Sequence, residues 1–190
     1  MLENHSFENV GPFANNIYVV TEPLTRETAV LDVGFHPEQV VEFVRRERLK
    51  VRWLLATHAH YDHVAAMFLV QRAVGGDFAL HPADRPLLAN VATQGSMFGL
   101  PPVEVPEVAL DLAEGQRIPL GEEWLDVLFA GSVGRTDLPG ASWATLEHSI
   151  RERLFPLGDE MHVLPGHGPA TKIGEERRHN PFVGEAAGRR

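Results

Sequence analysis

The chain has 190 residues, of which 44% are hydrophobic and 23% are charged, and these values are ordinary for a globular protein with one domain over residues 1–190. Its formal net charge of −9 argues against a nucleic-acid-binding function, which needs a basic footprint. Because the chain has no cysteine, disulfides, thiolate nucleophiles and cysteine-type zinc sites are excluded.

Residues 1–6 lack the basic and apolar regions of a secretory signal peptide. No apolar run approaches the roughly 20 residues that a membrane-spanning helix needs. The lack of disulfides also fits a reducing compartment. We therefore expect a cytoplasmic protein that does not bind a membrane.

The first half of the chain alternates strand-like and helix-like patterns. Two β-rich runs separated by a polar turn predict a hairpin, and proline at a first helical position predicts the start of a helix. In order, the patterns predict strands at 17–21 and 28–33, a helix from about Pro37, a strand at 51–56, a helix to about Val74, a strand at 77–81 and a helix from Pro82. This alternation predicts an α/β domain.

The second half contains more turn residues. Prolines and glycines over residues 90–107 predict an ordered loop or a rim near a site. The remaining expected elements are strands at 116–120 and 123–128, a helix from about Ala141, a strand at 160–164 and a short helical piece that stops at Asn180 and Pro181.

A cluster of metal-binding side chains directly follows the strand at 51–56. His58, His60, Asp62 and His63 lie within six residues. Imidazole binds zinc, iron or copper, and a carboxylate adds an anionic oxygen ligand. In an extended segment the first three side chains would point to one side and His63 to the other, so the stretch could serve two ions. A solvated polar loop is the alternative, but so tight a cluster among ten histidines favours a metal site.

One further histidine has an unusual setting. His167 lies between Gly166 and Gly168, and glycine on each side lets the backbone approach another segment closely. It is therefore a candidate ligand contributed by a distant strand end. His81, His148 and His162 are expected to be structural or exposed.

Residues 57–63, Thr-His-Ala-His-Tyr-Asp-His, resemble the His-x-His-x-Asp-His signature of the metallo-β-lactamase superfamily. Residues 131–137 and 165–169 look like segments of its glyoxalase II-like branch, the hydroxyacylglutathione hydrolases and their short single-domain relatives. The resemblance implies a four-layer αββα sandwich, an α/β fold that some schemes class as α+β. It also implies two metal ions at one edge, between the sheets.

By motif position, the resemblance implies that His58 and His60 bind a first ion, and that Asp62, His63 and His167 bind a second. Zinc is the expected metal, two ions per site, with iron and manganese as alternatives. In the family, a metal-bound hydroxide attacks the carbonyl of a thioester. Asp62 is implied as the catalytic residue that orients this nucleophile or accepts a proton.

The chain departs from the family at the 128/129 junction. A further histidine and a bridging aspartate are expected there, and this sequence has neither. One explanation is a real deletion; the other is a segment that the natural molecule carries and the printed sequence omits. We favour the second, because deleting paired strands would leave backbone groups of the sheet unpaired. A Cα–Cα separation well above about 3.8 Å across the junction would support it.

Three functions follow from this resemblance. The first is hydrolysis of a small-molecule thioester of the glyoxalase II type, from S-acylglutathione to a hydroxy acid and glutathione. The second is a mononuclear iron enzyme of the persulfide dioxygenase type. The third is an inactive metal-binding or interaction domain, which the absent ligands would permit. The sequence assigns neither the substrate contacts nor the oligomeric state.

Overall fold

The computed structural model describes residues 1–113, 116–126 and 143–185. Contacts within the chain divide it into two compact units. The first contains residues 1–127 and 166–168, and the second contains residues 128–165 and 169–190. The short segment 166–168 thus belongs to the first unit, although its neighbours in sequence belong to the second.

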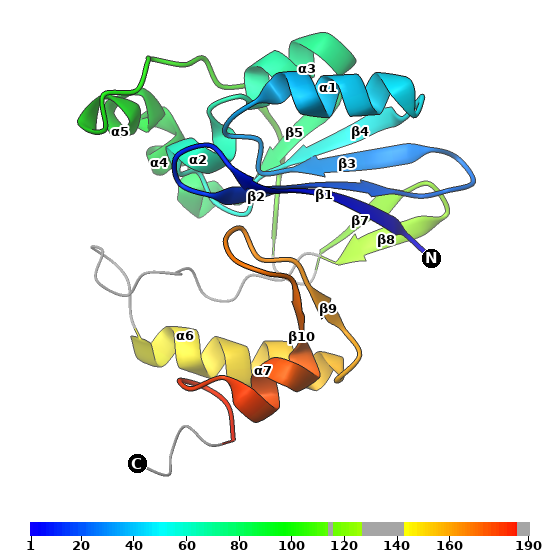
Figure 1. Cartoon of the computed structure of the whole chain (residues 1–190), viewed down its shortest axis with the longest axis vertical. Helices are drawn as coiled ribbons and strands as arrows, with labels where there is room; N and C mark the ends of the chain where they lie inside the picture. Colours follow the sequence, from blue (N-terminus) through cyan, green and yellow to red (C-terminus); the bar gives the residue numbers. More distant parts are fainter. Residues whose placement is uncertain (114–115, 127–142, 186–190) are drawn as a thin grey trace. The chain divides into compact units, whose positions relative to one another are not determined.

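A six-stranded sheet lies at the centre of the first unit, with its strands in sequence order (Figure 1). The strands are β1 (Glu3–Val10), β2 (Asn15–Thr21), β3 (Glu27–Leu31), β4 (Lys50–Leu55), β5 (Asp77–Leu80) and β6 (Val108–Asp111). β1, β2 and β3 are antiparallel, whereas β3 to β6 run parallel. The predicted hairpin and the predicted α/β class are confirmed.

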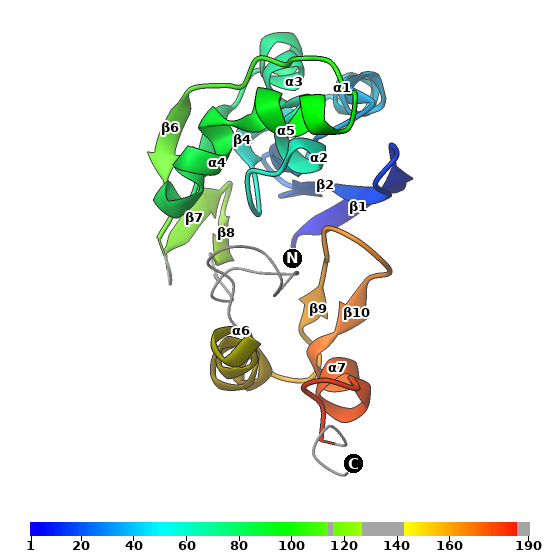
Figure 2. The ribbon, with the colours of Figure 1, turned by 90° about the vertical axis from the view of Figure 1, so that its left-hand side faces the viewer.

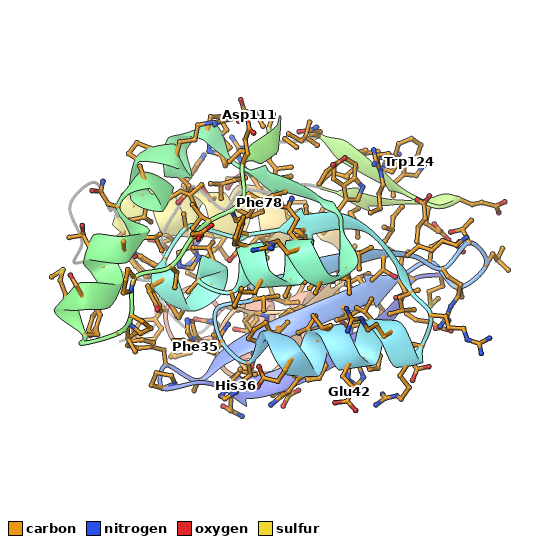
Figure 3. All side chains as sticks on the ribbon, turned by 90° about the horizontal axis from the view of Figure 1, so that it is seen from above. Phe35, His36, Glu42, Phe78, Asp111 and Trp124 are labelled. Atoms are coloured by element: carbon orange, nitrogen blue, oxygen red, sulfur yellow. The ribbon has the colours of Figure 1, made fainter. Side chains whose placement is uncertain are left out.

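Helices α1 (Pro37–Arg46) and α3 (Met67–Val74) lie side by side over one face of this sheet (Figures 1 and 3). Helix α1 begins at Pro37, as predicted. Proline is tolerated there because the N–H of a first helical residue has no partner within the helix. Val40 and Val44 are buried one helical turn apart, and Glu42 points away from α3 in Figure 3. Each fully buried valine contributes roughly 1.5–3 kcal/mol of hydrophobic stabilisation, which fixes α1 on the sheet.

Two predictions about the first unit are wrong in detail. The helix after the histidine cluster is divided into α2 (Tyr61–Val64) and α3, and at the break Ala66 N donates to Val33 O at 3.0 Å. The segment 90–107, expected to be an ordered loop, begins with helix α5 (Val91–Met97). Gly95 weakens the helical pattern in the sequence, but it is needed because a Cβ there would lie 2.4 Å from the Tyr61 ring.

The first unit contains further short elements outside the six-stranded sheet. They are the 3₁₀ turn η1 (Pro82–Asp84), helix α4 (Arg85–Ala89) and the antiparallel hairpin of β7 (Arg117–Leu120) and β8 (Glu123–Asp126), shown in Figure 2. The indole N–H of Trp53 donates to Pro119 O at 2.8 Å and ties the hairpin to the sheet. Both strands of this hairpin were predicted, whereas the edge strands β1 and β6 were not.

The second unit is smaller and largely helical. Its elements are α6 (Trp143–Ser149), η2 (Ile150–Leu154), η3 (Phe155–Leu157), β9 (His162–Val163), β10 (Thr171–Lys172) and α7 (Ile173–His179). Asp159 pairs with the guanidinium groups of Arg177 and Arg178, and its carbonyl accepts from Gly174 N at 3.1 Å. Within the described ranges of both units, no helix has the length and apolar character needed to cross a membrane.

Candidate metal centre

The candidate centre lies where two neighbouring parallel strands end. β3 is followed by Asp32, and β4 is followed after Ala56 by the histidine cluster. Because the strands are parallel, their carboxyl ends meet at one edge of the sheet. Thr57 N donates to Asp32 Oδ1 at 2.8 Å, and its hydroxyl donates to Oδ2 at 2.9 Å. The buried carboxylate of Asp32 thereby fixes the start of the cluster to the end of β3.

Polar side chains from outside the motif hold the loop before α2. Ala59 N donates to Asp84 Oδ1 at 3.3 Å. The Gln94 amide accepts from Tyr61 N at 3.1 Å and donates to Ala59 O at 3.3 Å. His60 is the last extended residue, and α2 begins at Tyr61. The alternation that the sequence predicted for an extended segment therefore does not reach Asp62 and His63, because both residues lie in a helix.

Three of the five predicted ligands come together. Nε2 of His63 lies 3.1 Å from Nε2 of His167, and Asp62 Oδ2 lies 3.4 Å and 3.2 Å from these two atoms. A four-coordinate ion with bonds of about 2.0–2.1 Å places its ligand atoms about 3.3–3.4 Å apart, and a six-coordinate ion places them about 3.0 Å apart. The triangle therefore matches the donor spacing of a metal ion.

His63 is oriented by a second carboxylate. Its side chain is buried, and Nδ1 lies 3.2 Å from Asp32 Oδ2, an ion-pair distance without hydrogen-bond alignment. A carboxylate behind a metal-binding imidazole directs the other ring nitrogen toward the ion. Asp32 thus links Thr57 and His63, although the sequence showed it only as the end of a strand.

His167 reaches the centre because its flanking glycines pair with β2. Asn16 N donates to Gly166 O, and the Asn16 side-chain amide donates to Gly168 O, both at 2.7 Å. A Cβ at Gly166 would lie 2.7 Å from Cε1 of His63, so glycine permits this approach. The close backbone contact expected from the two glycines is present.

His58 and His60 lie beside the triangle. Their rings meet edge to face with centroids 4.5 Å apart, and the His58 ring is 4.1 Å from that of His63. Burial, reinforced by the charge of His63, lowers the pKa of His58 to about 4. His58 is therefore neutral at pH 7, the form of imidazole that binds metals.

The charges around His63 differ from those around His58. Burial lowers the pKa of His63, but the carboxylates of Asp32 and Asp62 outweigh burial and raise this pKa to about 9. For Asp62, burial raises the pKa, and the hydrogen bond and charge of His63 more than offset it, so the pKa is lowered. A metal ion that binds Nε2 of His63 must therefore displace a proton from an imidazolium that Asp32 and Asp62 stabilise.

We expect the metal-free protein to lose stability as the pH rises from 6 to 10. The His63 pKa is about 9 in the folded chain against the ordinary 6.5, so its charge stabilises the fold fully below pH 6.5 and no longer does so above pH 9. The loss is on the order of 3 kcal/mol. Urea unfolding with a chelator at pH 6, 8 and 10 measures it. Asp32→Asn should flatten this dependence, and an equal slope in the variant would contradict the assignment.

Gly34 lies against the backbone of the motif at Asp62. A Cβ there would lie 1.8 Å from the carbonyl oxygen of Asp62, which cannot move without shifting α2. Gly34→Ala should therefore lower the free energy of unfolding by about 3 kcal/mol or more, measured by urea unfolding. Gly75→Ala is the control: no atom lies within 4 Å of a Cβ there, and its φ of 81° costs about 1–2 kcal/mol. Equal losses in the two variants would show that Asp62 does not depend on this contact.

Three other histidines were expected to be structural or exposed, and none of them belongs to the triangle. His81 precedes η1, and its Nδ1 accepts from Ala83 N at 3.3 Å, a structural role as expected. His148 in α6 and His162 in β9 are exposed.

Residues 131–137 and the 128/129 junction lie outside the residues that the structure describes. The choice between a deletion and an omitted segment therefore stays a prediction.

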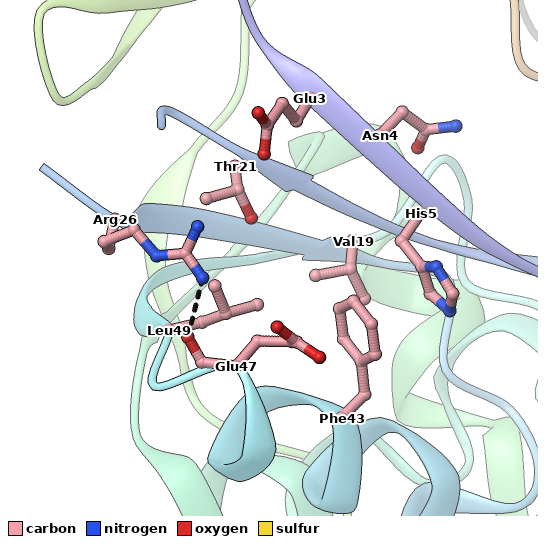
Figure 4. A pocket seen from close by; sticks show the side chains of 9 residues that line it. All are labelled: Glu3, Asn4, His5, Val19, Thr21, Arg26, Phe43, Glu47 and Leu49. Atoms are coloured by element: carbon pink, nitrogen blue, oxygen red, sulfur yellow. Dashed lines mark hydrogen bonds between the residues drawn. The ribbon is translucent and has the colours of Figure 1, made fainter. Parts of the chain in front are cut away.

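A hollow of about 130 Å³ lies elsewhere in the first unit (Figure 4). Its lining consists of Glu3, Asn4, His5, Val19, Thr21, Arg26, Phe43, Glu47 and Leu49. Thr21 pairs with Thr28 at the start of β3, so the hollow lies at the amino ends of β3 and β4. It contains none of the candidate ligands and is separate from the metal centre.

Comparison with known proteins agrees with the geometry. A family model described as the metallo-beta-lactamase superfamily matches residues 10–124, more than half of the chain. The chain belongs to the metallo-β-lactamase superfamily. The resemblance drawn from the sequence is confirmed, and membership supports a metal-dependent hydrolase. The match includes the histidine cluster and ends before the 128/129 junction.

Hydroxyacylglutathione hydrolase GloC of Haemophilus influenzae is 30% identical to this chain over 187 residues, covering 83% of this chain and 88% of GloC. The alignment includes about 158 residues of this chain, which is 83% of its 190 residues. The chain therefore has gaps at about 29 of the 187 aligned positions. The shortfall lies within the aligned span.

Two crystal structures show the same fold over nearly the whole chain. BLEG-1 B3 metallo-beta-lactamase is 27% identical with a TM-score of 0.81, covering 96% of this chain and 99% of its own. TTHA1623, in a di-iron-bound form, is 33% identical with a TM-score of 0.76, covering 94% and 99%. The predicted metallo-β-lactamase fold is confirmed.

Proposed function

We propose that this superfamily member hydrolyses thioesters in the manner of glyoxalase II, cleaving S-acylglutathione into a hydroxy acid and glutathione. The observation that carries the proposal is the triangle of Asp62 Oδ2, His63 Nε2 and His167 Nε2, with edges of 3.1–3.4 Å. The similarity to GloC supports the substrate class. The net charge of −9 supports a small-molecule partner rather than nucleic acid or an anionic membrane, and the lack of cysteine supports a cytoplasmic location.

The chain's residues have separable roles in this reaction. When bound by Asp62, His63 and His167, an ion (zinc, or alternatively iron or manganese) would supply a water of lowered pKa and would polarise the carbonyl. Asp62 is ionised at neutral pH because its pKa is lowered, so it can hold the ion and orient the nucleophile. Asp32 and the glycines around His167 keep both imidazoles aimed at the ion. Asp62 is the catalytic residue, and Asp32 is a positioning residue.

The test is thioester turnover by metal-stripped and metal-reloaded protein. An S-acylglutathione and an acyl thioester of a different thiol should be compared, because the second shows whether glutathione itself is recognised. We expect turnover only after reloading, and His162→Ala, a change at an exposed histidine, should keep it. No metal-dependent turnover of any thioester would reject the proposal and favour the inactive metal-binding domain.

A mononuclear iron enzyme of the persulfide dioxygenase type is the second candidate. Two histidines and one carboxylate on one face form the ligand set of non-haem iron(II) oxygenases, and here they are His63, His167 and Asp62. The iron in TTHA1623 also favours this metal. Iron-loaded protein should then consume oxygen when a persulfide is added. Iron-independent thioester turnover without oxygen consumption would exclude this candidate.

A further inference from the structure

The two predicted ligand sets are unequal. Within the described parts of the chain, the one group of three or more metal-binding side chains with ligand atoms within 4.8 Å of one another consists of Asp62, His63 and His167. A catalytic zinc normally keeps three protein ligands and one open position, and this set meets that number. His58 and His60 supply two ligands at most, which is too few for a comparable site.

In both imidazoles of the triangle, the other ring nitrogen, Nδ1, faces an oxygen atom. Nδ1 of His63 faces Asp32 Oδ2 at 3.2 Å, and Nδ1 of His167 lies 3.4 Å from Ala14 O. Both neighbours are acceptors, so each favours a proton on Nδ1 and leaves the lone pair on Nε2. The two Nε2 atoms then face each other at 3.1 Å beside a carboxylate oxygen. This arrangement is repulsive unless a proton or a metal cation lies between them, and it therefore offers a position for one ion.

The length of the chain agrees with one ion rather than two. The alignment with GloC contains positions that this chain lacks, and the sequence has no histidine between His81 and His148 to join His58 and His60. The three ligands of the triangle, by contrast, are all present and come from two distant segments. In this sequence the ligand set of Asp62, His63 and His167 is complete, and the set that includes His58 and His60 is not.

We propose that this chain holds a single metal ion, on Asp62, His63 and His167, and that His58 and His60 hold no second ion. The inference rests on the metal centre that also carries the proposed function, but not on thioester turnover. It differs from the two-ion arrangement that the family resemblance implied, and it takes the 128/129 junction as a real deletion rather than as an omitted segment.

Metal counting on the full chain tests the stoichiometry. Protein saturated with Mn²⁺ and freed of excess metal should contain one ion per chain by mass spectrometry. The double variant His58→Ala/His60→Ala should keep this ion, and so should the control His162→Ala. His167→Ala should weaken Mn²⁺ binding by at least about 100-fold in calorimetry, because it removes one of three ligands. Asp62→Asn, which keeps the shape but loses the charge, is a second test if His167→Ala misfolds.

Electron paramagnetic resonance of the same samples gives an independent readout. An isolated Mn²⁺ gives a six-line spectrum, whereas two neighbouring ions give a spin-coupled one. Two ions per chain, a coupled spectrum, or loss of the ion in the double variant would overturn the inference and leave the hydrolase proposal intact. One ion without turnover of any thioester would reject the proposed function and leave the single-ion centre standing.

Discussion

Replacing Asp62 by alanine should lower kcat/KM for thioester hydrolysis by about 1,000-fold, equivalent to about 4 kcal/mol of transition-state stabilisation. Its Oδ2 is the single carboxylate oxygen of the triangle, 3.2 Å from Nε2 of His167 and 3.4 Å from Nε2 of His63. Without it, the centre would lose the proposed negative ligand, which is also the group proposed to orient the nucleophile. Steady-state assays of metal-loaded protein measure the effect.

Asp77→Ala is the matched control for this variant. Asp77 is a carboxylate in an exposed ion pair with Arg52 at 3.0 Å, at the start of β5 and outside the candidate ligand set. Its loss should leave kcat/KM within about a factor of two, because exposed ion pairs contribute little. If Asp62→Ala were as active as Asp77→Ala, Asp62 would be neither a ligand nor a catalytic residue.

Removing the metal should lower the free energy of unfolding by about 4 kcal/mol at a free ion concentration 1,000 times Kd. For a chain of this size the loss corresponds to a fall in Tm of about 10 °C. An ion held by Asp62, His63 and His167 would stabilise the fold, because it would join α2 to the segment 166–168, which is far from α2 in sequence. Thermal unfolding with and without a chelator measures the difference.

The variant His167→Ala provides the comparison for metal removal. It should unfold near the temperature of the stripped protein, and chelator should not lower its Tm further. His167 is half-exposed, so its truncation leaves no buried cavity that would confuse the result. A chelator effect of equal size in this variant would place the stabilising ion elsewhere.

The spacing of functional residues made part of the centre predictable. His58, His60, Asp62 and His63 follow a buried apolar run, and local sequence alone marked them as metal-binding. The glycines on each side of His167 predicted a close backbone approach, and Gly166 does lie against the His63 ring. Both predictions depended on local chemistry, which a sequence displays directly.

The other features of the centre could not be predicted, because they depend on contacts between segments that are distant in sequence. Asp32 looked like the end of a strand, and its role follows only once β3 and β4 lie parallel with their ends together. Gln94 lay in a segment expected to be a loop, yet it bonds to both sides of His60. The wrong alternation for Asp62 has a similar cause, because the helix start at Tyr61 is set by tertiary contacts rather than by a capping residue.

The most direct test of the account is the position of the metal in a crystal. Crystals of the protein loaded with zinc, or separately with Mn²⁺, should show an anomalous scattering peak about 2.0–2.3 Å from Oδ2 of Asp62 and from Nε2 of both His63 and His167. A peak centred on His58 and His60, or no peak within bonding distance of the three atoms, would contradict the account.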